Sequence, residues 1–225
     1  KTPYIIPNQF GLIDKDGEEI ESGLIIIDEL VKTISFNNIK SKPTPSWFRG
    51  FSAPIKFSSD LSIQNKIYLA SSDTDPFNRW DSTQSLWLEY VLNPDQVSEK
   101  DLFQMIKNLF NNESDYSLLS EMISLPSEQI IHQNVGKIDV QVVHNQRNQS
   151  ILSIASTFKD ELLELYDQLN TPKAFDLSTQ SIGERALKNK CLSYLSKLGE
   201  YDIACLLYTS PSPRDAHESR MPSSA

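Results

Sequence analysis

The sequence predicts an α+β fold in two parts, a partial β-sandwich followed by an α-helical domain. Up to about Ser58, apolar and polar residues alternate and turn signals interrupt them, which is typical of strands. From about Ser59, apolar residues recur at helical spacing, and Ser or Asp precedes most of these segments. We therefore predict domains at residues 1–58 and 59–204, with the change of architecture at FSAPIKF, residues 51–57.

The first part carries several strand signals. The DKDG turn, Asp14–Gly17, lies between two apolar segments and predicts a β-hairpin. Residues 24–30 form a short apolar run, and residues 33–39 alternate apolar and polar side chains. Residues 47–57 predict a last strand pair or a bent strand, in which Pro54 requires an edge or a bulge. Four or five strands are visible, whereas an immunoglobulin-type sandwich has about seven, so we expect the first strands to lie upstream.

The second part is predicted to be helical throughout. We expect helices to begin at or near Asp75, Ser98, Ser114, Asp139 and Ser178. Residues 139–169 predict one long helix or two, and Gly199 should end the last helix. The apolar stripes predict burial of Phe77, Trp80, Trp87, Leu88 and Leu195. Successive helices with short connections indicate a bundle or a solenoid of helix pairs.

The composition limits the class of protein. Of 225 residues, 39% are hydrophobic and 23% are charged, an ordinary balance for a chain with a packed core. The net charge of −9 argues against a nucleic-acid partner. We find neither a signal peptide nor an apolar run of the roughly 18 residues that a membrane span needs. The two cysteines, Cys191 and Cys205, are too few for a disulfide framework, so we expect a cytoplasmic protein.

Residues 205–225 break the pattern of everything before them, with Ser-Pro pairs and no apolar period. They closely resemble the conceptual translation of a transposase sequencing adapter, in which two constant stretches flank a short index. The alternative is a disordered polar tail. On the adapter interpretation Cys205, Arg214 and His217 have no function, and the natural chain continues differently after residue 204.

The sequence contains no recognisable catalytic motif. Zinc hydrolases of the H-E-x-x-H type need two imidazoles one helical turn apart, and His132, His144 and His217 lack that spacing. Cys191 lies on an apolar helical stripe and is predicted to be a buried structural thiol. We also find no G-x-S-x-G elbow and no phosphate-binding glycine loop. We therefore assign no catalytic, cofactor-binding or metal-binding residue.

Two tryptophans seven residues apart, Trp80 and Trp87, fall on one predicted helical face. Core packing is the default interpretation of such a pair. An aromatic groove for a peptide is the alternative.

Three motifs, FSAPIKF, DPFNRWDSTQSL and IGERALKNKCLSYL, occur in this order at residues 51–57, 75–86 and 182–195. Together they closely resemble the C-terminal half of bacterial-type aminopeptidase N, the alanyl aminopeptidase branch of the gluzincin zinc metallopeptidases. The resemblance runs from about Tyr4 to Glu200. It implies an immunoglobulin-like sandwich after the catalytic domain, and then an ARM/HEAT-like helical domain that caps the active-site chamber.

The resemblance also limits what this chain can do. In that family the G-A-M-E-N segment, the H-E-x-x-H zinc site and the catalytic Tyr all precede this region, and none is in this sequence. The expectation is thus an internal, non-catalytic scaffold fragment of a monomeric aminopeptidase. The whole enzyme would hold zinc and cleave N-terminal residues from peptides, and this part would bind no zinc. The alternative is a non-catalytic family member, or an unrelated helical-repeat protein, that acts as an interaction scaffold.

Overall fold

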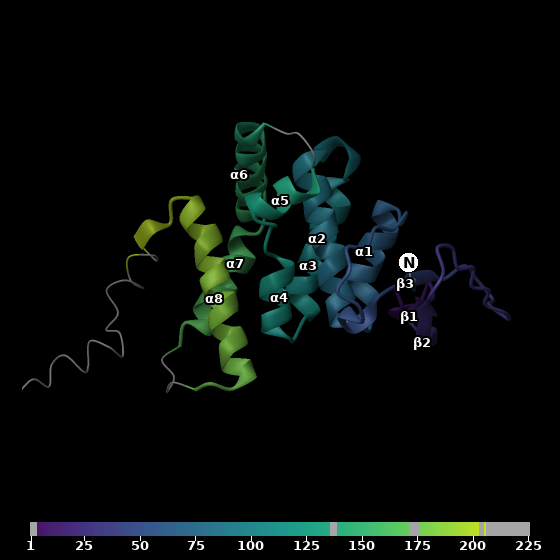
Figure 1. Ribbon diagram of the computed structural model, residues 1–225. Helices are drawn as coiled ribbons and strands as arrows, with labels where there is room; N and C mark the ends of the chain where they lie inside the picture. Colours follow the sequence, from purple (N-terminus) through teal and green to yellow (C-terminus); the bar gives the residue numbers. More distant parts are fainter. Residues whose placement is uncertain (1–3, 136–138, 172–175, 203–204, 206–225) are drawn as a thin grey trace, which may run out of the picture.

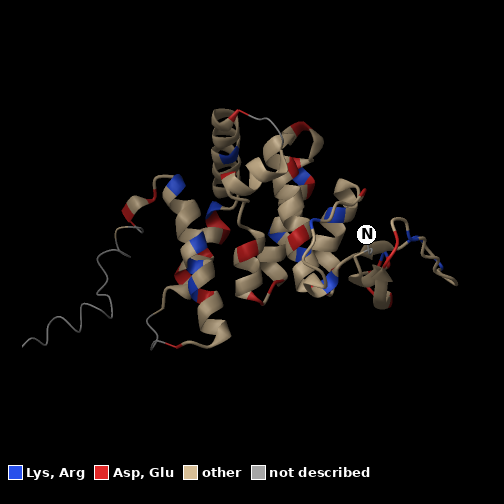
Figure 2. Cartoon of the chain, in the orientation of Figure 1, with Lys and Arg blue, Asp and Glu red and all other residues tan. Residues whose placement is uncertain are grey.

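The computed structural model describes residues 4–135, 139–171, 176–202 and 205. A small antiparallel sheet lies at one end, and eight α-helices follow it across the described part of the molecule, ending with α8 at the far side (Figure 1). This arrangement confirms the predicted fold class. None of the described helices is long and apolar enough to cross a membrane. Lys and Arg are interspersed with Asp and Glu along the helices in this view (Figure 2).

The sheet has the order β2-β1-β3, and both pairings are antiparallel. Its strands are β1 Ile6–Ile13, β2 Glu19–Ile27 and β3 Thr44–Ser46. The predicted hairpin at Asp14–Gly17 is confirmed, because it joins β1 to β2. The Asp14 carboxylate accepts hydrogen bonds from the backbone N–H groups of Asp16 and Glu18, and Gly17 supplies the φ of 87° that the turn requires.

Two strand predictions are wrong. Residues 33–39 form no strand, since Asn38 has a left-handed φ of 60°. From this loop Phe36 covers Phe10 of β1, with ring centroids 5.3 Å apart. Residues 47–57 also form no strand. A short 3₁₀ turn, Arg49–Phe51, follows β3 instead, with Phe48, Gly50 and Phe51 at φ of 55°, 60° and 55°. These dihedrals are incompatible with an extended chain, so the described residues hold three strands rather than four or five.

The helical part follows the predicted caps closely. Its helices are α1 Ile63–Ser72, α2 Pro76–Leu92, α3 Glu99–Asn112, α4 Tyr116–Met122, α5 Glu128–Asn134, α6 Val140–Thr157, α7 Lys159–Leu169 and α8 Thr179–Lys197. The side chains of Asp75, Ser98, Asp139 and Ser178 each accept a first-turn backbone N–H, which confirms these four starts. The start predicted at Ser114 is one residue early. Asp115 caps α4 because its carboxylate accepts two N–H groups, those of Ser117 and Leu118.

The helical core surrounds α2 and α8. Trp87 and Leu195 are fully buried, as predicted. The indole N–H of Trp87 donates to the carbonyl of Met122 at 2.8 Å. Phe77, Trp80 and Leu88 are largely rather than fully buried, and Trp80 and Leu88 pack against the helical core. Near the N-terminus of α2, Phe77 stacks on Phe51 with ring centroids 5.4 Å apart and on Trp80 with centroids 5.7 Å apart.

Candidate functional site

The most elaborate polar arrangement in the described residues lies at the joint, which we define as residues 46–52 together with residues 73–75 between α1 and α2. Arg49 is at its centre and is almost fully buried. Its Nη1 lies 2.5 Å from Oε2 of Glu19 on β2, and its Nη2 lies 2.8 Å from Oδ1 of Asp73. Nη2 also donates to the hydroxyl of Thr74. One guanidinium therefore links the sheet to the start of the helical part.

A glycine on β1 makes room for this guanidinium. A Cβ atom at Gly11 would lie 2.6 Å from Nη1 and 2.9 Å from Cζ of Arg49, which is shorter than any ordinary contact. The backbone of β1 and the Arg49 side chain thus need a residue without a side chain at this position.

The DPFN segment at the start of α2 both begins the helix and fastens the joint. Asp75 caps α2 through Oδ1, which accepts the N–H of Asn78, and its Oδ2 accepts the N–H of Gly50 at 2.9 Å. The side-chain amide of Asn78 donates to Ser46 Oγ at 2.5 Å and to the Trp47 carbonyl at 2.9 Å. These contacts give a physical reason for the DPFN sequence that helix propensity alone does not supply.

The electrostatics of the joint favour its ion pairs. Side-chain hydrogen bonds from Ser22 and then from Arg49 lower the pKa of Glu19 from 4.5 to about 2. Burial opposes the charge on Arg49, but Glu19 and Asp73 outweigh it and raise the pKa of the guanidinium. Arg49 Nε and Asp73 Oδ2 have no hydrogen-bond partner among the described residues. Such an incompletely paired buried network is weak evidence for net stability, although removing one partner would leave a buried charge unpaired.

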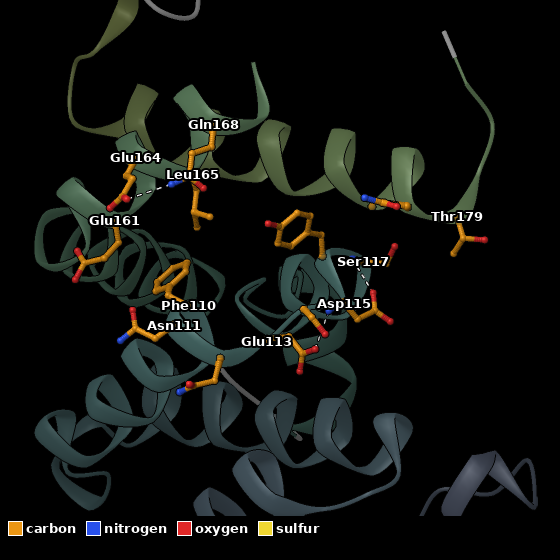
Figure 3. A pocket seen from close by; sticks show the side chains of 15 residues that line it. Phe110, Asn111, Glu113, Asp115, Ser117, Glu161, Glu164, Leu165, Gln168 and Thr179 are labelled. Carbon is orange, nitrogen blue, oxygen red and sulfur yellow. Dashed lines mark hydrogen bonds between the residues drawn. The ribbon is translucent and has the colours of Figure 1, made fainter. Parts of the chain in front are cut away.

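A second feature is an acidic hollow of about 770 Å³ formed by α3, α4, α7 and α8. Figure 3 shows the carboxylates of Glu113 and Asp115 on one side and those of Glu161 and Glu164 on the other. Their charges are already engaged in the fold. Glu113 pairs with Arg79 at 2.6 Å, Glu161 lies 3.5 Å from Lys107, Asp115 caps α4, and Glu164 accepts a hydrogen bond from Gln168. We assign no chemistry to this hollow.

The described histidines and cysteines lie on α5, α6 and α8 and at residue 205. His144 has Nδ1 2.8 Å from Oε1 of Glu128 and Nε2 2.8 Å from the side-chain amide of Asn148, while His132 lies on α5. Burial raises the pKa of Cys191 to about 12. Within the described ranges, no three His, Cys, Asp or Glu side chains gather as a metal site. His217 and Arg214 lie outside the described residues, and Cys205 is exposed.

The sequence locates the change of architecture at residues 51–57 but does not reveal the ion pairs of Arg49. Arg49 is the only cation in the aromatic stretch SWFRGF, residues 46–51, and that isolation was the available signal. Its partners Glu19 and Asp73 are 30 and 24 residues away, so no local pattern could identify them.

These features describe a class of protein in which a small antiparallel sheet is joined through a buried ion network to an array of helices. The comparisons with known families define it further. A family model described as a domain of unknown function with an Ig-like fold, DUF3458, matches residues 1–60. A second, DUF3458_C, described as ARM repeats, matches residues 63–212. The chain belongs to the DUF3458 family, with its Ig-like part followed by its ARM-repeat part. The second match includes residues 205–212, within the segment that resembles an adapter.

The relatives of this chain are aminopeptidases. Aminopeptidase N of Caulobacter vibrioides is 29% identical over 193 residues, which are 83% of this chain and 22% of that protein. Aminopeptidase N of Escherichia coli K12 is 27% identical over 226 residues, 92% of this chain and 26% of that protein. The crystal structure of Legionella pneumophila aminopeptidase A in complex with aspartic acid matches with a TM-score of 0.80 and 26% identity, covering 89% of this chain and 25% of that one.

These matches confirm the family resemblance found in the sequence. They lie in the C-terminal part of the relatives, and the chain spans about a quarter of the length of the relatives it matches.

Proposed function

We propose that this chain is the non-catalytic scaffold of a zinc-dependent aminopeptidase that removes N-terminal amino acids from peptides. One observation carries the proposal. The Ig-like and ARM-repeat parts match aminopeptidases in the same order and over most of this chain, at 26–29% identity. The joint supports a scaffold role, because the Arg49 network holds the two parts in one fixed arrangement.

The described residues do not fit a catalytic zinc site, which takes three protein ligands and a water molecule. We therefore place the zinc of the whole enzyme upstream of this region. When bound there, it would polarise the scissile carbonyl and activate water. The contribution of this chain would be structural, as part of the wall around the peptide substrate. We also propose that the enzyme is a cytoplasmic monomer. The low cysteine content supports the cytoplasmic location, and it does not bear on the oligomeric state.

The test is to read the coding sequence upstream of residue 1 and to produce the extended protein. We expect an H-E-x-x-H motif, and we expect about one zinc ion per extended chain by atomic absorption. The matched control is the 225-residue chain, purified in the same buffer, which should hold no stoichiometric zinc. An extended protein that folds, lacks the motif and binds no zinc would contradict the proposal. It would instead identify the whole protein as a non-catalytic family member that acts as an interaction scaffold.

A further inference from the structure

We draw no further inference here: the strongest candidate, the exposed apolar patch of Phe51, Ile55 and Phe57 around the hollow between the 3₁₀ turn that follows β3 and the start of α2, is a surface for which nothing among the described residues shows what covers it.

Discussion

The substitution Arg49→Met isolates the charge at the joint, because Met retains most of the apolar stem and removes the guanidinium. The Asp73 side chain has no exposed surface and would remain buried without its ion pair. Breaking a buried pair in this way costs about 3–5 kcal/mol of unfolding free energy. Glu19 is 29% exposed and can be rehydrated, so it should add no more than about 1 kcal/mol. We expect a total loss of about 3–5 kcal/mol, a large part of the 5–15 kcal/mol typical of a domain.

Urea unfolding followed by tryptophan fluorescence measures this loss, since Trp47 belongs to the joint and Trp87 reports on the helical core. The double variant Arg49→Met/Asp73→Asn should be more stable than Arg49→Met alone, because it no longer buries an unpaired charge. Lys32→Met is the matched control, because it breaks the more exposed pair with Asp28 and should cost at most about 1 kcal/mol. A loss below about 1 kcal/mol for Arg49→Met, or strictly additive effects in the double variant, would refute the reasoning.

Two further predictions concern the sheet and the helical core. The pKa of Glu19 is lowered to about 2, so its contribution to stability should be complete above pH 4.5 and lost as the pH falls toward 2. The unfolding free energies of the wild type and Glu19→Gln, measured from pH 7 downward, should therefore converge in acid, and a constant difference would contradict this. Gly183→Ala should cost about 1–3 kcal/mol, because the new Cβ would lie 2.7 Å from Ser117 Oγ and 2.9 Å from its backbone N. Exposed Ser193→Ala on the same helix is the control, and equal urea midpoints for the two variants would argue against tight α4–α8 packing.

Features that depend on local chemistry were predictable from the sequence. Asp75, Ser98, Asp139 and Ser178 cap helices because a side-chain oxygen two or three residues from an unpaired N–H is sufficient. The hairpin at Asp14–Gly17 follows from an Asp that binds its own turn and a Gly that tolerates positive φ. The family motifs identified the order of the two parts.

Features that depend on distant contacts were not predictable. The composition of residues 47–57 predicts a strand. Instead the Phe48 N–H donates to Asn8, 40 residues away, and the Asn78 amide donates to the Trp47 carbonyl, 31 residues away, so this segment forms a turn. A single apolar face was predicted for α2, whereas Phe77 at its start stacks on Phe51 and the apolar residues that follow pack on the helical core. The ion pairs of Arg49 could not be predicted from the sequence for the same reason, since their carboxylates come from β2 and from the connection between α1 and α2.

The central claim is that this chain belongs structurally to an aminopeptidase whose chemistry lies upstream. The most direct measurement is the release of a chromogenic amine from an alanyl anilide by the upstream-extended protein and by the 225-residue chain. We expect turnover of about 1 s⁻¹ or faster for the extended protein, abolished when a chelator removes its metal, and no hydrolysis by the chain alone. Hydrolysis by the 225-residue chain, or a folded, zinc-loaded extended protein that releases no amine, would contradict the account.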